Sequence, residues 1–306
     1  QEIKIGIIGG GGIVKSRHIP GFNKINDVVI SGICNRSIES SQKFAKEFNV
    51  KKVFSSPEEL LTSKDIDAVI IGTWPYKHCE YTLKSLAAKK HVFVQARMAM
   101  NLEEAQKMMK ASAENPQLAA MICPSPFGFS ADLTIRKLIA ENYVGKIMAV
   151  KYTNLGKFNP EAPITWRHMK NFSGLNIMAV GIYYETISRW VGHAKEVFAF
   201  KSQNIKQRID SESKITKTVE IEDDVIIVGS LKNGGSYNYH FGFSNHPPSE
   251  TLEIYGVDGS IVFHFDKDIL LTAKRGEDLK PVSVPSSMKK EWQVEQNFIT
   301  QIKTGE

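Results

Sequence analysis

The sequence predicts an α/β protein in two parts: an N-terminal doubly wound parallel sheet and a C-terminal α+β domain with a mostly antiparallel, open sheet. Three observations support this prediction. A β-branched run at residues 3–8 leads directly into four consecutive glycines. Strand and helix patterns then alternate as far as residue 122, as they do in βαβ units. Beyond Pro126 most apolar runs are short and separated by turn residues, which is typical of antiparallel hairpins.

The elements of the first part follow from local patterns. Apolar runs predict strands at residues 3–8, 28–34, 68–72, 91–94 and 118–122. Amphipathic spacing predicts helices at residues 14–24, 38–48, 75–88 and 102–114. Ser37 and Asn101 are the expected N-caps, and Pro75 suits the first turn of its helix.

A domain boundary is expected after Cys123, where Pro124 and Pro126 stiffen the chain, which gives domains of residues 1–123 and 124–306. In the second domain we expect helices at residues 127–141 and 175–190. Strands are expected at residues 147–154, 197–203, 225–231, 236–243, 251–255 and 260–265. Asn233-Gly234-Gly235 and Asp258-Gly259 predict hairpin turns with positive φ.

Composition excludes several classes of protein. The chain has 306 residues, is 42% hydrophobic and 24% charged, and contains no apolar run near the ~18 residues of a membrane span. No signal peptide precedes the first strand, so we expect a cytoplasmic protein. The three cysteines have no metal-ligand spacing, and no metal site is predicted. The net charge of +6 comes from scattered lysines, which argues against nucleic acid and suits an anionic cofactor.

The glycine turn is the strongest functional signal. Gly9 permits the tight turn after the first strand, and Gly11 lets the backbone approach a pyrophosphate. The helix that follows offers free N–H groups to the phosphates. Val14 replaces the small third residue of this fingerprint, which widens the helix–strand contact and leaves the phosphate site in place. We therefore assign Gly9, Gly11, Gly12 and Ile13 to dinucleotide binding in a Rossmann-type domain.

The end of the second strand predicts which cofactor is bound. A carboxylate at this point selects NAD, whereas a neutral residue followed by Arg accommodates the 2′-phosphate of NADP. The sequence there is Asn35-Arg36-Ser37, so we predict NADP, with NAD as the alternative. The competing interpretation is that Arg36 only caps a solvated helix start.

Several motifs together resemble the Gfo/Idh/MocA oxidoreductases, the family of glucose–fructose oxidoreductase and inositol dehydrogenase. They are the turn 9–12, the stretch Gly72-Thr73-Trp74-Pro75-Tyr76-Lys77-His78, Lys90 to Val94, and Trp166-Arg167 through Ser173-Gly174 to Gly181. The resemblance spans essentially the whole chain. It implies cofactor contacts for Thr73, Trp74, Pro75, His78, Gln95 and Ala96, although Pro75 and His78 also suit a purely structural helix start.

The same comparison shows a departure from the family pattern. Members usually carry Glu-Lys-Pro after the fourth strand, where this chain has Gln95-Ala96-Arg97. Members also carry Asp and His, spaced by four, where this chain has Ala179 and Tyr183. The usual acid/base set is therefore replaced, and its mechanism cannot simply be transferred.

Hydride transfer still needs a proton donor or acceptor for the carbinol oxygen. Tyr183 can serve if a neighbouring cation lowers its pKa, and Arg97 and Lys151 are the candidate cations. Arg97 would also orient the substrate. His168 is a second acid/base candidate because its pKa lies near neutrality. Tyr183 in the core, Arg97 in a structural ion pair and His168 in solvent are the competing interpretations.

The resemblance places Trp166 and Arg167 at the substrate pocket, and Tyr184 is a further polar candidate beside Tyr183. The leading hypothesis is an NAD(P)-dependent oxidoreductase acting on a sugar, cyclitol or related small carbonyl or alcohol with an altered acid/base set. The alternatives are a non-catalytic NAD(P)-binding sensor or scaffold, and an NAD(P)-assisted lyase or glycosidase that uses transient oxidation.

The second-domain sheet also predicts self-association. Apolar side chains on its strands, from residues 225–228 and from Tyr237, Tyr239 and Phe241, would leave one sheet face uncovered. Such a face favours a homodimer or homotetramer through the C-terminal sheet.

Overall fold

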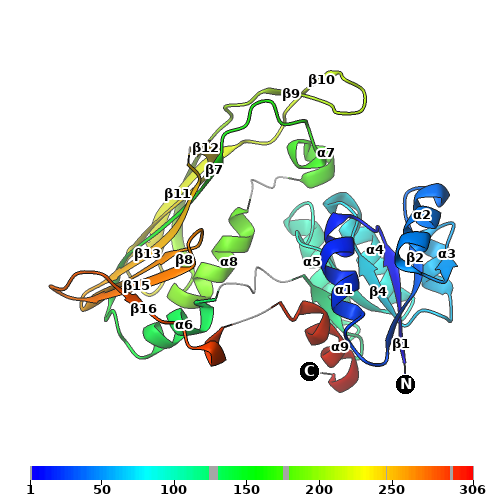
Figure 1. Cartoon of the computed structure of the whole chain (residues 1–306), viewed down its shortest axis with the longest axis horizontal. Helices are drawn as coiled ribbons and strands as arrows, with labels where there is room; N and C mark the ends of the chain where they lie inside the picture. Colours follow the sequence, from blue (N-terminus) through cyan, green and yellow to red (C-terminus); the bar gives the residue numbers. More distant parts are fainter. Residues whose placement is uncertain (1, 124–129, 175–178, 246, 290–291, 306) are drawn as a thin grey trace. The chain divides into compact units, whose positions relative to one another are not determined.

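The computed structural model describes residues 2–123, 130–174, 179–245, 247–289 and 292–305 (Figure 1). The chain divides into two compact units. Unit 1 comprises Gln1–Pro124, Asn171–Leu175 and Gln293–Glu306, and unit 2 comprises Ser125–Lys170 and Asn176–Trp292. The chain therefore passes from one unit to the other four times.

Unit 1 is built on a six-stranded sheet in the order β3-β2-β1-β4-β5-β6. Its strands are β1 (Ile3–Ile8), β2 (Val28–Cys34), β3 (Lys52–Val53), β4 (Ala68–Ile71), β5 (His91–Val94) and β6 (Ala120–Ile122). Every neighbouring pair is parallel. The order reverses between β1 and β4, and ligands of doubly wound sheets bind at such a switch point. The predicted fold class of the N-terminal part is confirmed.

Helices cover both faces of this sheet. They are η1 (Val14–His18), α1 (Ile19–Phe22), α2 (Ile38–Phe48), α3 (Pro57–Thr62), η2 (Pro75–Lys77), α4 (His78–Ala87), α5 (Leu102–Ala113) and α9 (Val294–Thr304). Successive side chains of a strand point to opposite faces. On β5, the Phe93 ring meets His18 of η1 and Phe298 of α9, whereas Val92 and Val94 pack in the core cluster that includes leucines of α3 and α4.

The two predicted N-caps are confirmed, whereas the helices expected at 14–24 and 75–88 begin with the π-helical turn η1 and the 3-10 turn η2. The side chains of Ser37 and Asn101 accept hydrogen bonds from backbone N–H groups at the starts of α2 and α5, as N-caps do. The helix expected at 14–24 contains a π-helical turn, η1, and ends at Phe22. β3, α3 and α9 were not predicted.

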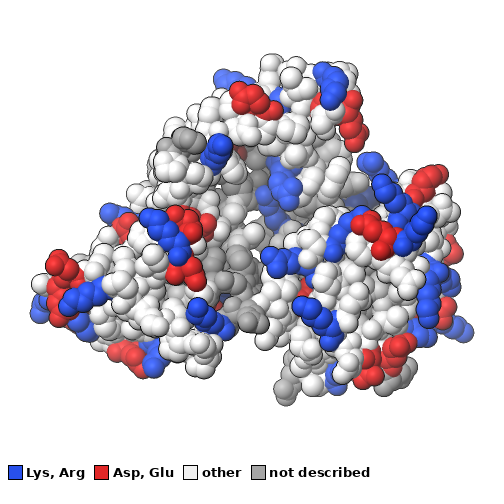
Figure 2. Space-filling view, in the orientation of Figure 1, with Lys and Arg blue, Asp and Glu red and all other residues white. Residues whose placement is uncertain are grey.

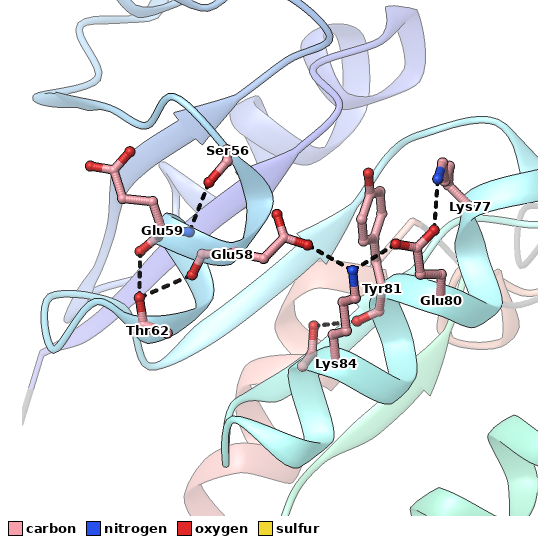
Figure 3. A network of polar contacts seen from close by, with 9 residues as sticks. Ser56, Glu58, Glu59, Thr62, Lys77, Glu80, Tyr81 and Lys84 are labelled. Carbon is pink, nitrogen blue, oxygen red and sulfur yellow. Dashed lines mark hydrogen bonds and ion pairs between the residues drawn. The ribbon is translucent and has the colours of Figure 1, made fainter.

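Charged side chains join α3 to α4 on the surface of unit 1. The Lys84 ammonium lies 2.7 Å from a carboxylate oxygen of Glu58 on α3 and 2.7 Å from one of Glu80 on its own helix (Figure 3). Lys77 pairs with the other oxygen of Glu80 at 2.7 Å. On the face of the molecule shown in Figure 2, basic and acidic side chains are interspersed.

Unit 2 is built on an eight-stranded sheet in the order β16-β15-β14-β13-β7-β12-β11-β8. Its strands are β7 (Ile147–Lys157), β8 (Ala194–Ser202), β11 (Asp224–Leu231), β12 (Ser236–Asn245), β13 (Ser249–Gly256), β14 (Gly259–His264), β15 (Ile269–Lys274) and β16 (Lys280–Val282). A separate hairpin pairs β9 (Gln207–Ile209) with β10 (Thr216–Thr218). The β7–β12 pair is parallel and the other pairs are antiparallel, so the predicted mostly antiparallel sheet is confirmed.

The helices α6 (Asp132–Ala140) and α8 (Val180–Val191) lie against one face of this sheet (Figure 1). They are joined by a buried hydrogen bond of 2.7 Å from Trp190 Nε1 to Asp132 Oδ1. The short elements are η3 (Trp166–His168), α7 (Lys170–Ser173) and η4 (Ser286–Met288). The predicted helix starts at 127–129 and 175–178 lie outside the described residues.

Two expectations about the second sheet were wrong. The β13–β14 hairpin forms, but neither Asp258 nor Gly259 has a positive φ. Gly259 is required for space instead, because a Cβ there would lie 2.5 Å from a backbone oxygen. Tyr237, Tyr239 and Phe241 do not line the uncovered face: they are buried in the core with α6 and α8.

The described residues contain no helix long and apolar enough to cross a membrane. Within the same residues, no group of three or more His, Cys, Asp or Glu side chains is arranged to hold a metal ion. Cys34, Cys79 and Cys123 are buried free thiols.

Candidate functional site

The glycine turn at the end of β1 is fixed by close backbone contacts. Gly9 has φ +88°, a left-handed conformation that favours glycine. Its N–H donates to the Cys34 carbonyl at 2.9 Å, and a Cβ on Gly9 would lie 2.8 Å from the Thr73 nitrogen. The turn is therefore held tightly between the ends of β2 and β4.

The next glycines face open space. Among the described residues, a Cβ on Gly12 would meet no atom within 4 Å, and one on Gly11 would meet only the Gly72 carbonyl oxygen at 3.4 Å. Packing within the protein therefore does not require glycine at these two positions. Room at the start of a helix beside the switch point fits the pyrophosphate of a dinucleotide.

Val14 is accommodated by a glycine opposite it. The side chain is fully buried, and a Cβ on Gly72 would lie 2.4 Å from a Val14 methyl carbon. Gly72 thus takes over the role of the small third residue of the fingerprint, and the larger side chain fits between η1 and the end of β4.

The three residues after β2 have different environments. The Asn35 side-chain oxygen accepts a 2.7 Å hydrogen bond from the Gly10 N–H, so this residue supports the glycine turn. Ser37 caps α2 through the Ser40 N–H. Arg36 is exposed and makes no ion pair with a described residue. Of the three, only Arg36 has a side chain available for a 2′-phosphate.

His78 joins the two loops that follow β4 and β5. Its fully buried ring places Nδ1 2.6 Å from the Arg97 carbonyl oxygen and Nε2 2.9 Å from that of Thr73. Burial lowers the pKa of His78, while hydrogen bonds to these carbonyls raise it. The ring is therefore a structural tie between the segments that carry Trp74, Pro75 and Ala96.

Gln95 also turns into the interior. Its side chain contacts Nε2 of His18, whose Nδ1 lies 2.5 Å from the Glu295 carboxylate. All three residues are at most 7% exposed. These three side chains form a buried chain of contacts from the end of β5 through η1 to α9. The Gln95 side chain therefore positions the loop that follows β5 from inside the protein.

Exposed aromatic rings stand where β4 ends. Trp74 and Tyr76 are 37% and 38% exposed, and Phe172 contacts their rings at centroid distances of 5.1 and 5.4 Å. Sequence reasoning selected Trp74 and missed the other two. They form an apolar platform that continues from Thr73 beside the glycine turn.

Tyr183 stands in a different environment from the one expected. Its ring stacks on Tyr152 of β7 at 4.8 Å, and the charged group that acts on its hydroxyl is the Glu250 carboxylate of β13. Burial, followed by the Glu250 carboxylate, raises the pKa of Tyr183 well above its usual range. The prediction that a cation lowers this pKa was wrong, because the charged neighbour is an anion.

Lys151 and Tyr184 do not join Tyr183. Lys151 lies on the other face of β7 from Tyr152, where it approaches Glu253 at 3.9 Å. The Tyr184 hydroxyl accepts from the Ala194 N–H at 3.3 Å, near the start of β8. Neither residue is positioned beside the Tyr183 hydroxyl.

The η3 turn carries the remaining candidates. His168 Nδ1 accepts from the Thr165 N–H at 2.9 Å in a capping box, and burial together with Arg208 lowers its pKa. The Arg167 guanidinium stacks over the Trp166 ring at 4.3 Å. The segment between β10 and β11 holds this turn in place, because the Glu220 N–H donates to the His168 carbonyl at 2.8 Å.

Sequence reasoning also missed Tyr152, Asn154 and Glu250. The alternation of β7 places Tyr152 and Asn154 on one face, and this much was readable from the sequence. Glu250 lies 98 positions further along the chain from Tyr152, and only the register of β13 on β7 brings it there.

A parallel sheet in the order β3-β2-β1-β4-β5-β6 with an open glycine turn at its switch point is the architecture of a dinucleotide-binding protein. Residues 3–122 match the model described as an oxidoreductase family with an NAD-binding Rossmann fold. Residues 133–262 match that of the GFO/IDH/MocA C-terminal domain. The chain belongs to the GFO/IDH/MocA oxidoreductase family, which confirms the resemblance seen in the sequence.

Relatives include named sugar dehydrogenases. Glucose-6-phosphate 3-dehydrogenase of Bacillus subtilis is 28% identical over 234 residues, 75% of this chain and 65% of the relative. Levoglucosan dehydrogenase of Pseudarthrobacter phenanthrenivorans is 24% identical over 292 residues, 87% of this chain and 75% of the relative.

Solved structures share the fold at lower identity. A levoglucosan dehydrogenase in complex with NADH and L-sorbose has a TM-score of 0.84 and 22% identity, covering 99% of this chain and 90% of that one. Biliverdin reductase from Synechocystis sp. PCC 6803, in complex with biliverdin and NADP+, has a TM-score of 0.79 and 17% identity over the same shares.

Proposed function

We propose that this protein is an NADP-preferring oxidoreductase that acts on a small sugar-like or cyclitol-like carbonyl or alcohol. The observation that carries the proposal is the open space over Gly11 and Gly12 in a turn otherwise fixed by its own packing. When bound there, a nicotinamide dinucleotide would supply or accept the hydride. The named sugar dehydrogenases among the relatives support the substrate class.

The preference for NADP rests on Arg36. Its exposed guanidinium follows β2, and position 35 holds an asparagine instead of the acidic residue that would bind the ribose 2′-hydroxyl of NAD. Arg36→Asp should reverse the preference in fluorescence titrations with NADPH and NADH. Lys43→Asp, an equal change of charge at another exposed position of α2, is the matched control and should leave the preference unchanged.

We assign the acid/base role to Tyr183, with His168 as the alternative acid/base group and Arg97 as the residue that orients the substrate. The phenol is protonated at neutral pH and can donate a hydrogen bond to a carbonyl oxygen, but the raised pKa of Tyr183 makes it a weaker acid than a free phenol, so proton transfer needs a second group. Tyr183→Phe keeps the ring stack on Tyr152 and removes only the hydroxyl. Turnover of this variant at the wild-type rate would refute the role.

The first experiment is NADPH titration followed by a panel of sugar and cyclitol ketones. Tight binding with oxidation of NADPH by a panel member supports the reductase. Tight binding without turnover would favour the sensor, or the lyase that uses transient oxidation. Absence of binding would contradict the proposal as a whole.

Self-association is proposed through the uncovered face of the unit 2 sheet. Phe198 and Phe200 of the edge strand β8 are 69% and 58% exposed, and they pair in register with Val228 and Ile226 of β11. A contiguous apolar face of this kind suits a second copy of the chain. Light scattering should show a dimer or tetramer, and Phe198→Asp should reduce its mass toward that of the monomer.

A further inference from the structure

Two stacked phenols lie beside a single carboxylate in unit 2. The Tyr152 hydroxyl donates to Glu250 Oε1 at 2.9 Å, and the Tyr183 ring stacks on the Tyr152 ring at a centroid distance of 4.8 Å, where the same carboxylate acts on its hydroxyl. Asn154 donates to the Tyr152 oxygen from the same strand at 3.1 Å. Glu250, Tyr152 and Asn154 project from the sheet face that α8 covers, and Tyr183 comes from α8 itself.

The surroundings of this cluster are apolar. Phe241 of β12 and Phe265 after β14 lie 6.3 and 6.1 Å from the Tyr183 ring centroid. Among the described residues, the titratable groups that act on Tyr183 from the packed strands are Tyr152 and Glu250.

A buried phenol cannot alone complete a proton transfer at neutral pH. If Tyr183 takes a proton from a substrate hydroxyl, it must release its own proton at the same time, because a phenol oxygen holds one proton in its neutral form. The acceptor must lie beside it. Glu250 satisfies this requirement, and it is half-buried rather than sealed from water.

We infer that Glu250 is a positioning residue for Tyr183 and the group with which Tyr183 exchanges its proton; the inference rests on the proposed function. In alcohol oxidation the substrate O–H bond breaks and a new O–H bond forms on Tyr183. The former Tyr183 O–H bond breaks, and its proton passes to the Glu250 carboxylate. In carbonyl reduction the same two protons move in the opposite direction.

Two variants test the inference by turnover. Glu250→Gln keeps the shape and removes the proton acceptor, so kcat should fall about 100-fold, at the lower end of acid/base effects, while NADPH binding is unchanged. The kcat of Glu250→Ala should fall by a similar factor and recover when formate is added, which a merely structural role would not explain. Glu253→Gln is the control: it removes a 2.6 Å bond from Tyr255 on the other face of β13 and should keep wild-type turnover.

A second measurement needs no cofactor. A double-mutant cycle of Tyr183→Phe with Glu250→Gln should give a coupling free energy of unfolding, whereas Tyr183→Phe with Glu253→Gln should give none. Wild-type kcat in Glu250→Gln, or a loss that formate does not restore together with zero coupling, would overturn the inference. An inactive wild-type protein would overturn the proposed function first, and the inference with it, even if the coupling is present.

Discussion

Replacement of Glu295 by alanine should destabilise unit 1 by about 3 kcal/mol. The carboxylate is the 2.5 Å partner of His18 Nδ1, and both residues are at most 2% exposed. A buried donor left without its acceptor costs about 1–3 kcal/mol. The remainder comes from the empty space that the variant leaves against Gly21. In the wild-type protein the Glu295 side chain packs so closely on Gly21 that a Cβ there would lie 2.6 Å from a carboxylate oxygen.

Urea unfolding followed by circular dichroism measures this change. Glu295→Gln keeps the volume and one acceptor oxygen, so it should cost about 1 kcal/mol. Gln296→Ala, at an exposed neighbouring position of α9, should stay within about 0.5 kcal/mol of wild type. The reasoning is refuted if Glu295→Ala costs less than about 1 kcal/mol, or if Gln and Ala are equally harmful.

Three further predictions follow from the same unit. Gly12→Ala should leave the free energy of unfolding unchanged or slightly higher but weaken NADPH binding, whereas Gly72→Ala should lower both, because its Cβ would lie 2.3 Å from a backbone oxygen. The free energy of unfolding should fall as the pH drops below about 6.5, because burial lowers the pKa of His91 in the folded state and its Nδ1 accepts from the Ala119 N–H. Urea titrations at pH 7 and pH 5 measure this dependence, and His91→Asn should weaken it. Lys84→Met should cost at most about 1 kcal/mol in thermal unfolding, because its ammonium is screened by water despite two carboxylate partners.

Local features of this fold were predictable from the sequence because their causes are local. The glycine turn follows directly from the order of strand, glycines and helix, and the caps at Ser37 and Asn101 come from single residues ahead of amphipathic runs. The family resemblance added the order of the units. The predicted caps and the predicted ends of the alternating strands and helices therefore lie close to those in the structure.

Features that depend on distant partners were not predictable. The inward turn of the Gln95 side chain was not predictable, because it meets His18, and the partner of His18 is a glutamate 277 positions further along the chain on a helix that was not predicted. The expected lowering of the Tyr183 pKa failed for the same reason, since burial and the charge of Glu250 are set by tertiary packing. The prediction of a positive φ at Asp258-Gly259 was wrong because Gly259 is needed for lack of space beside a backbone oxygen, and not for its backbone conformation.

Because α9 belongs to unit 1, the part of the chain that is synthesised first cannot be the first to finish folding. When residues 1–123 have left the ribosome, Phe298 and Glu295 are still missing from the face that carries Phe93 and His18. All of unit 2 is synthesised before α9, so it can fold in this interval. A nascent chain arrested after Trp292 should thus hold a folded antiparallel sheet and an incomplete parallel one, whose bare apolar face is a substrate for a chaperone until the last helix arrives.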